Sequence, residues 1–164
     1  MIPTSRELIA GITRTLEQEV LPELASATWT ASSIRSCIML LAHLEERVVH
    51  EGRILYQDNI ELRALLGRLR TDLSGPLPDA AKAISATLDV TTPPAGYPAV
   101  EELDRINQRL KTVLEQTVTA LHEGREALGD RRFQMLNATI LTYLSSAADR
   151  DDIMFAKAFG KSPL

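Results

Sequence analysis

Cysteine and histidine are scarce in this sequence, which has one cysteine and three histidines in 164 residues. A single cysteine excludes a disulfide within the chain, and one cysteine with three scattered histidines excludes a closed zinc site. The cysteine, Cys37, lies among Ile34, Ile38 and Leu41. Because no neighbouring base marks it as a nucleophile, we expect Cys37 to be a small buried hydrophobic residue.

Long apolar runs are also absent. The longest wholly apolar run covers residues 37–42, whereas about 20 apolar residues are needed to span a bilayer. The chain starts without the basic stretch and apolar segment of a secretory signal. These absences predict a cytoplasmic protein with no membrane association.

Neither sign of charge dominates, since 18 Lys and Arg residues stand against 22 Asp and Glu residues, a net charge of −4. Residues 1–73 carry 8 basic and 10 acidic groups, and residues 100–164 carry 9 basic and 10 acidic groups. A nucleic-acid-binding protein gathers Lys and Arg on one face, where they displace counterions from phosphates. The even distribution therefore predicts no nucleic-acid partner.

The loops that carry common catalytic chemistries are missing as well. The patterns Gly-x-Ser-x-Gly, Gly-x-Gly-x-x-Gly and Gly-x-x-x-x-Gly-Lys do not occur in the chain. Their absence removes the usual nucleophile elbow and the usual cradles for nucleotide phosphates. The sequence thus predicts no catalytic residue and no cofactor.

The chain does have apolar residues at three- and four-residue spacing, which indicates amphipathic helices. Thr4 and Glu7 match a Thr-x-x-Glu capping box that starts the first helix, and Pro22 is expected to kink or end it near Leu21. The predicted core face of this helix consists of Leu8, Ile12, Leu16, Val20 and Leu24. We predict an all-α protein with a single domain over residues 1–164, an up-down bundle of four main helices and a short crossover helix.

The longest predicted helix covers about residues 31–72. Apolar residues follow one another there at intervals of seven, at Ile34, Leu41, Val48, Leu55, Leu62 and Leu69. One continuous helix explains this phase, and the alternative is two helices with a break at Asp58. Such a helix is about 60 Å long, whereas a compact domain of this size is about 40 Å across. The overhang predicts a homodimer with Val48, Leu55, Leu62 and Leu69 in its interface.

A crossover rich in proline and glycine occupies residues 74–98, which hold five of the eight prolines. A short helix is predicted within it at residues 79–88, followed by a long helix over residues 99–128 that Gly129 ends. In the final helical region, either Asp149 caps a new helix or Asp151 is a buried acid. The acids at 149, 151 and 152 favour the cap, because a helix dipole attracts them to a first turn.

Two groups of polar residues are candidates for binding. His43, Glu46 and His50 share one face of the long helix, as metal ligands would, although that face is predicted to point to solvent. The second group consists of polar residues that interrupt apolar stripes and are candidates for a ligand pocket between helices. Its members are Glu45, Asn59 and Asp151.

A pattern near the N-terminus resembles a known family. It consists of Pro3-Thr4, Glu7-Leu8, Leu16-Glu17, Glu19-Val20-Leu21-Pro22, Leu41 and Glu45. With these residues, the first 60 or so positions resemble a family of small bacterial helical proteins known only as a domain of unknown function. Members are often encoded beside acyl-CoA dehydrogenases and kinase-like phosphotransferases. The resemblance implies an accessory role near acyl-CoA metabolism and brings no catalytic motif.

Two functions are consistent with this sequence. The first is a non-enzymatic accessory or partner-binding module that acts as a homodimer, as the seven-residue spacing and the missing catalytic motifs suggest. The alternative is a bundle that binds a small ligand or a metal ion, linked to acyl-CoA metabolism, in which polar residues between helices contact the ligand.

Overall fold

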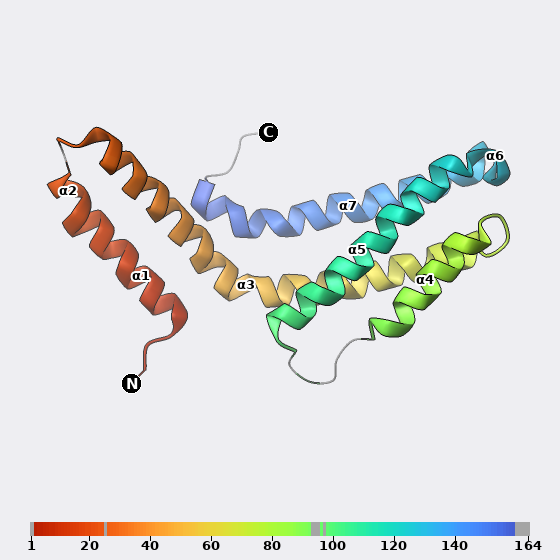
Figure 1. The fold of residues 1–164 in the computed structure, drawn as a ribbon, viewed down its shortest axis with the longest axis horizontal. Helices are drawn as coiled ribbons and strands as arrows, with labels where there is room; N and C mark the ends of the chain where they lie inside the picture. Colours follow the sequence, from red (N-terminus) through yellow and green to blue (C-terminus); the bar gives the residue numbers. More distant parts are fainter. Residues whose placement is uncertain (1, 25, 93–95, 97, 160–164) are drawn as a thin grey trace. The chain divides into compact units, whose positions relative to one another are not determined.

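The structure is a computed structural model that describes the chain except residues 1, 25, 93–95, 97 and 160–164 and the side chains of residues 153–159. Its regular elements are helices, and no strand occurs in the described residues (Figure 1). The all-α prediction is therefore confirmed. The chain divides into unit 1, formed by Met1–Gly52 with Arg150–Leu164, and unit 2, formed by Arg53–Asp149. The single domain expected from the chain length stays a prediction.

Unit 1 begins with the predicted capping box. The Thr4 hydroxyl accepts a hydrogen bond from the Glu7 amide at 3.2 Å, and the Glu7 carboxylate accepts one from the Thr4 amide at 2.7 Å, so helix α1 covers Ser5–Thr15. A π-helical turn at Leu16–Val20 and the short helix α2 at Leu21–Glu23 follow. Pro22 lacks an amide proton and crowds the carbonyl of residue 18, and the wider turn directly before it is consistent with that crowding. The helical residues nevertheless continue through Pro22 to Glu23, so the expected end near Leu21 is not observed, and the departure from α-helical geometry lies in the turn before it.

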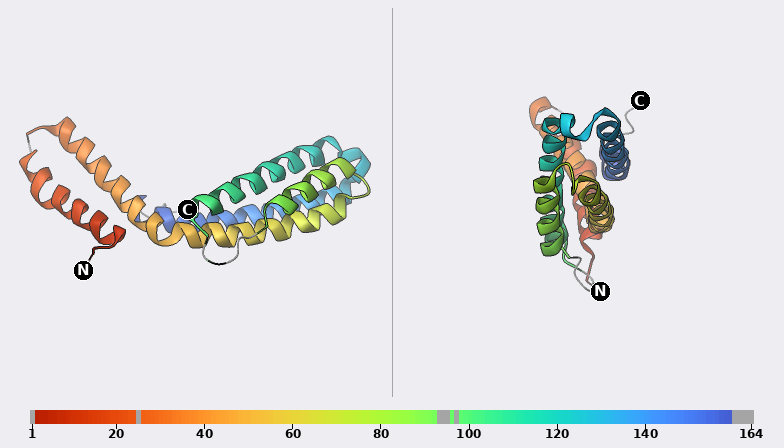
Figure 2. Two further views of the ribbon diagram at one scale, coloured as in Figure 1. Left: turned by 60° about the horizontal axis from the view of Figure 1, so that its bottom comes forward. Right: turned by 90° about the vertical axis from the view of Figure 1, so that its right-hand side faces the viewer.

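Helix α3 runs over Thr28–Leu73 without a break, a length of 46 residues. The continuous helix predicted over residues 31–72 is thus confirmed, and the alternative break at Asp58 is wrong. Residues 28–52 of α3 belong to unit 1, where they lie beside α1 and run in the opposite direction (Figure 2). The rest of α3 belongs to unit 2.

Unit 2 contains the main hydrophobic core. There the end of α3 packs with α4 (Pro78–Val90), α5 (Val100–Glu123), α6 (Arg125–Leu128) and the first part of α7 (Asp130–Phe159). Its fully buried apolar side chains are Leu62, Leu66, Leu69, Leu73, Ile84, Leu110, Leu121 and Leu136. Each buried side chain of this size stabilises the fold by about 1.5–3 kcal/mol. Unit 2 therefore has a hydrophobic core formed by the helices of one chain.

Two glycines shape the end of unit 2. The helix predicted over residues 99–128 is interrupted at Gly124, where an added Cβ atom would lie 2.4 Å from the Cδ2 atom of Leu77. Glycine at this position lets the Leu77 side chain approach the backbone closely. Gly129 then ends α6 with a φ of 75°, as its predicted role requires.

Two burial predictions for unit 1 are wrong. In α1, Leu8 is 54% and Ile12 is 52% exposed, while Ile9 is buried. The packed side of α1 is thus rotated by one residue, or about 100°, from the predicted stripe. The other predicted residues of the stripe, Leu16, Val20 and Leu24, lie beyond α1 and are half-buried. Cys37 is also exposed rather than buried, because it shares a face of α3 with the exposed residues Leu40 and Leu44.

The predicted cap at Asp149 is wrong as well. Helix α7 continues through residues 149–152, and Asp151 is half-buried within it. No glycine or proline lies between residues 130 and 159 to end the helix, and the apolar spacing continues past Asp149. Across the described residues, no helix combines the length and the apolar content needed to cross a membrane.

Candidate functional site

The most unusual feature of unit 2 is a group of polar side chains inside its core. We call it the Asp58 cluster, and it consists of Asp58 and Asn59 from α3, Asn107 and Lys111 from α5, and Tyr143 from α7. Asp58 is 5% exposed and Asn107 is 1% exposed. Burying such polar groups is unfavourable unless hydrogen bonds to protein replace their hydrogen bonds to water. The hydrogen-bond partners of these residues therefore show whether the cluster is structural or open to a ligand.

Both carboxylate oxygens of Asp58 accept hydrogen bonds. The Tyr143 hydroxyl donates to Oδ1 at 2.8 Å, and the Asn107 amide nitrogen donates to Oδ2 at 2.7 Å. The ammonium of Lys111 lies 3.5 Å from Oδ2 and is partly exposed, so it balances the buried charge. The Asp58 carboxylate is thus held by two of the other helices at once.

The two asparagines continue the cluster toward the start of α5. The Asn107 amide nitrogen also donates to Asn59 Oδ1 at 3.0 Å, and the Asn59 amide nitrogen donates to the Leu103 carbonyl at 2.9 Å. Because each of these bonds joins α3 to α5, the cluster fixes how the two helices align. Its chemistry is that of a closed structural network, since the oxygens of the nearly fully buried Asp58 are already occupied by protein donors.

A groove of about 400 Å³ lies between α3 and α7, beside the cluster. Glu61 and Arg68 line it from α3, and Thr139, Thr142 and Ser146 line it from α7. The ring of Tyr143 also lines the groove, although its hydroxyl is turned to Asp58. The groove therefore offers charges of both signs and several hydroxyl groups. Tyr143, which lines it, is fixed by its hydrogen bond to Asp58.

Arg63 performs a second structural task in unit 2. Its guanidinium donates to the Leu88 carbonyl at 3.0 Å and to the Thr91 carbonyl at 2.6 Å. These carbonyls lie at the end of α4, where helical partners are lacking. Arg63 therefore caps α4 and ties it to α3.

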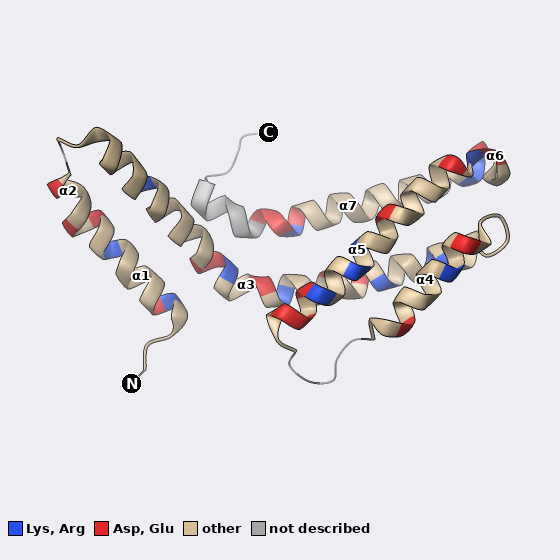
Figure 3. Ribbon diagram, viewed as in Figure 1, with Lys and Arg blue, Asp and Glu red and all other residues tan. Residues whose placement is uncertain are grey.

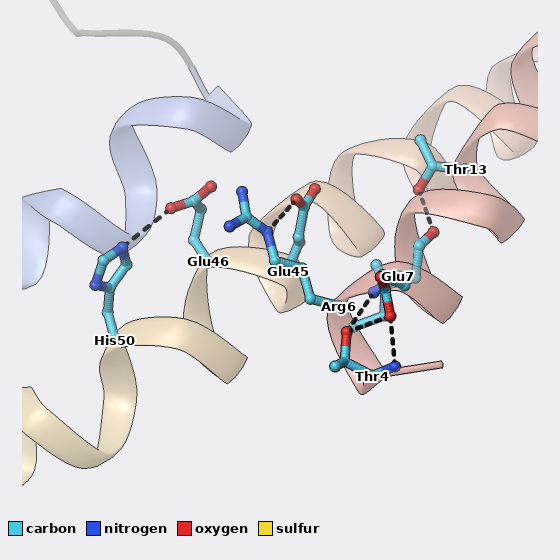
Figure 4. Close-up of polar contacts among 8 residues, drawn as sticks. Thr4, Arg6, Glu7, Thr13, Glu45, Glu46 and His50 are labelled. Carbon is cyan, nitrogen blue, oxygen red and sulfur yellow. Dashed lines mark hydrogen bonds and ion pairs between the residues drawn. The ribbon is translucent and has the colours of Figure 1, made fainter. Parts of the chain in front are cut away.

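The predicted pocket residues are not brought together. Asn59 is 6% exposed and belongs to the Asp58 cluster, whereas Glu45 and Asp151 both lie in unit 1. Glu45 accepts a hydrogen bond from Arg6 at 3.0 Å, which joins α3 to α1 (Figure 4). Glu45 thus stabilises the hairpin of α1 and α3.

The predicted metal ligands are half-buried rather than solvent-facing. His50 and Glu46 approach each other, with 3.4 Å between Nε2 and Oε2 (Figure 4). His43 lies on the same helix. Within the described residues, no group of three or more His, Cys, Asp or Glu side chains is placed to hold a metal ion.

The four residues predicted for a dimer interface have different environments. Leu62 and Leu69 are 0% and 1% exposed inside the core of unit 2. Their prediction as interface residues is therefore wrong, because the helices of their own chain already cover them. Leu55 is half-buried, and Val48 is 49% exposed. Of the four, Val48 leaves the most surface for a partner.

Unit 1 leaves many large apolar side chains exposed. Among its described residues only Ile9 and Ala31 are buried apolar side chains. The exposed ones in residues 1–52 are Ile2, Leu8, Ile12, Trp29, Met39, Leu40, Leu44, Val48 and Val49. Even Ile34, Ile38 and Leu41 are only half-buried. This part of the chain therefore does not cover its own apolar surface.

Charged residues are also sparse at the start of α3. Residues 28–44 contain one charged side chain, Arg35, besides His43, and the ribbon there is almost entirely uncoloured by charge (Figure 3). An exposed helix in water normally carries charged residues on its outer face. Low charge and exposed apolar side chains together distinguish this stretch from an ordinary exposed helix.

Comparison of the chain with protein-family models, with curated proteins and with solved structures found no match.

Several residues of the Asp58 cluster were missed by the sequence analysis. Asn107 lies between Leu103 and Leu110 at helical spacing, so it interrupts an apolar stripe as Asn59 does, and the same criterion would have selected it. The sequence around Asp58 indicates only a possible helix start. Its partner Tyr143 lies 85 residues away in sequence, and no local pattern links the two.

Proposed function

We propose that this protein is a non-enzymatic helical module that acts as a homodimer in the cytoplasm. The observation that carries the proposal is the contrast between the two units. Among the described residues, unit 2 buries 20 apolar side chains and leaves seven large ones exposed, whereas unit 1 buries only Ile9 and Ala31 and leaves nine large ones exposed in residues 1–52. Contiguous exposed apolar surface of this kind marks an interaction site in a soluble protein.

The arrangement of polar groups supports an interaction role over catalysis. The strongest cluster of polar residues, the Asp58 cluster, is buried, and its carboxylate is bonded to protein donors from two other helices. A catalytic acid or base must be within hydrogen-bond reach of a substrate. In unit 2 these groups instead fix the packing of the helices that carry them.

The proposal is tested by measuring the mass of the intact protein in solution. Sedimentation equilibrium over a wide range of concentration should give a species of twice the chain mass of 18.1 kDa. That species should dissociate to monomer on dilution. A single monomeric mass at every concentration would contradict the proposed homodimer.

A second candidate function is the binding of a small ligand in the groove between α3 and α7. Its volume of about 400 Å³ falls in the range of ligand pockets, about 300–1,000 Å³. A screen for ligands that raise the melting temperature would test it, with Arg68→Gln as the site variant and Arg70→Gln as the control. A ligand that stabilises the Arg68→Gln variant as much as the native chain does not use this groove.

The N-terminal resemblance supports placing this role beside acyl-CoA metabolism. Of its residues, Thr4 and Glu7 cap the start of α1, and Glu45 accepts the hydrogen bond from Arg6 that joins α3 to α1. Co-purification of the tagged chain with an acyl-CoA dehydrogenase from the same cells would support the link. Failure of the two proteins to associate at high concentration would count against it.

A further inference from the structure

We infer that the second copy docks on one face of the N-terminal hairpin, so that two hairpins form a four-helix bundle. The hairpin face consists of Leu8, Ile12, Leu40, Leu44 and Val48, which are between 46% and 62% exposed. This inference rests on the proposed homodimer and names the surface that forms it.

The exposed residues of α1 and α3 lie on the same side of the hairpin. On α1, the exposed Leu8 directly precedes the buried Ile9, and on α3 the exposed Leu44 directly precedes Glu45, which contacts α1. One residue turns a right-handed helix by about 100° in a fixed sense. Because the two helices run in opposite directions, residues that precede the packed positions fall on the same side of the plane through both axes.

The two stripes also lie at the same height. The bond between Arg6 and Glu45 sets the register of the hairpin. Because the helices are antiparallel, the residues that follow Arg6 in α1 lie opposite the residues that precede Glu45 in α3. Leu8 and Ile12 therefore lie at the level of Leu44 and Leu40. The apolar side chains of α1 and α3 are therefore neighbours and form one continuous patch.

The absence of charge on the α3 stripe of this face favours a second copy as its occupant. In a two-fold symmetric dimer each patch faces an identical patch, so a charge on it would oppose its own copy. The stripe of α3 from Trp29 through Ser33, Cys37, Leu40 and Leu44 has no charged residue. Arg47 and Glu51, at the edge of this stripe, pair with each other. On α1, Glu7 lines the same surface as Leu8 and Ile12, and its carboxylate accepts hydrogen bonds from Thr4. The α3 stripe can thus meet an identical stripe without repulsion.

The charge of the hairpin argues against a membrane as the occupant. Helices that bind membrane surfaces are rich in Lys and Arg around their apolar face. Residues 1–44 carry three arginines and four glutamates. A surface without a basic excess gains nothing from anionic lipids, so we take a second protein copy as the partner.

The whole side of the hairpin that carries the hairpin face is large enough for a stable interface. From Ser5 to Glu23 the first helical segment is roughly 30 Å long, and two helices are roughly 20 Å wide. A projected area on the order of 600 Å² corresponds to a larger accessible area, close to the 800 Å² or so per partner of a standard interface.

The test compares two pairs of substitutions that are matched in residue type and exposure. Leu40→Glu with Leu44→Glu changes the hairpin face, where these residues are 62% and 46% exposed. Leu141→Glu with Leu144→Glu changes α7 in unit 2, where the residues are 56% and 47% exposed. By light scattering after size exclusion, the first variant should be a monomer and the second a dimer.

A milder pair keeps the result interpretable if glutamate unfolds the hairpin. Leu40→Ala with Leu44→Ala preserves helix propensity, and loss of two anchors should raise the dimer Kd about 100-fold. If the native chain is a dimer and both hairpin variants remain dimers with native Kd, the inference is overturned while the homodimer stands. If the native chain is monomeric, the proposed function itself fails.

Cys37 provides an independent measurement on the native chain. It is the single cysteine, it is exposed, and its position three residues before Leu40 places it on the docking side of α3. Its alkylation rate should fall as the protein concentration rises through the dimer Kd. An alkylation rate independent of concentration across dimer formation would contradict docking on this face.

Discussion

The Asp58 cluster shows how individual polar residues specify the packing of unit 2. A core of leucine alone can pack in several registers, because its contacts are not directional. The bonds from Tyr143 to Asp58 and from Asn107 to both Asp58 and Asn59 form only in one alignment of three helices. We attribute the fixed register of α3, α5 and α7 in unit 2 to these bonds.

Replacing Tyr143 by phenylalanine should destabilise the fold. Tyr143→Phe keeps the ring but removes the hydroxyl that donates to the Asp58 carboxylate at 2.8 Å. Leaving a buried carboxylate short of a donor costs about 1–3 kcal/mol of unfolding free energy. In the control, Tyr56→Phe at a side chain that is 45% exposed, the change should stay within about 0.5 kcal/mol. Urea denaturation measures both, and equal effects would contradict the role assigned to the cluster.

The capping box at Thr4 should make the start of α1 sensitive to acid. The Thr4 amide, and then its hydroxyl, lower the pKa of Glu7 below its usual value of 4.5. The ionised Glu7 therefore stabilises α1 at pH values above its pKa in the unfolded chain, and this contribution is lost as the pH falls through the lowered pKa of the folded chain. NMR titration should give Glu7 a lower midpoint in the native protein than in urea. Equal midpoints would show that the box does not form in solution.

Residues with local partners could be predicted from sequence, and those with distant partners could not. Thr4 and Glu7 are three residues apart, so their spacing alone predicts the cap. Asn59 was recognised as a polar residue in an apolar stripe, but its partner Asn107 is 48 residues away. The spacing along one helix identifies a face and not what lies against that face.

At the scale of elements, α3 has two halves with different environments. Its apolar residues keep one phase from Ile34 to Leu69, and this phase correctly predicts a single helix. In unit 2 the same phase brings Leu62 and Leu69 into the core of the chain, whereas near Val48 it leaves apolar residues exposed. A seven-residue interval is consistent with both a core and a dimer interface, which is why sequence alone misassigned Leu62 and Leu69.

Glycines at two positions in unit 2 should respond to alanine in opposite ways. A Cβ atom at Gly124 would meet Leu77 at 2.4 Å and the Ala120 carbonyl at 3.0 Å, whereas one at Gly67 within α3 meets nothing within 4 Å. Gly124→Ala should lower the unfolding free energy by about 1 kcal/mol or more, because Leu77 must leave its place. Gly67→Ala should raise it by about 1 kcal/mol through helix propensity. Thermal or urea denaturation distinguishes them, and stabilisation by both changes would contradict the close approach at Gly124.

At the scale of the molecule, the two units differ in how completely they bury their apolar side chains. Unit 2 has a closed core, a capped crossover helix and a polar cluster that fixes its register. Unit 1 has a hairpin held by Arg6, Glu45 and a few half-buried side chains, with its apolar face exposed. If unit 1 carries the proposed self-association, its stability should depend on protein concentration while that of unit 2 does not.

Hydrogen exchange measured at two protein concentrations tests this central claim most directly. Backbone amides of α1 and of residues 28–48 in α3 should exchange more slowly above the dimer Kd than below it, because association suppresses opening of the hairpin. Amides of α4 and α5 serve as the internal control and should exchange at the same rate in both samples. Equal exchange of the hairpin amides above and below the Kd would contradict the claim that the second copy docks on the hairpin.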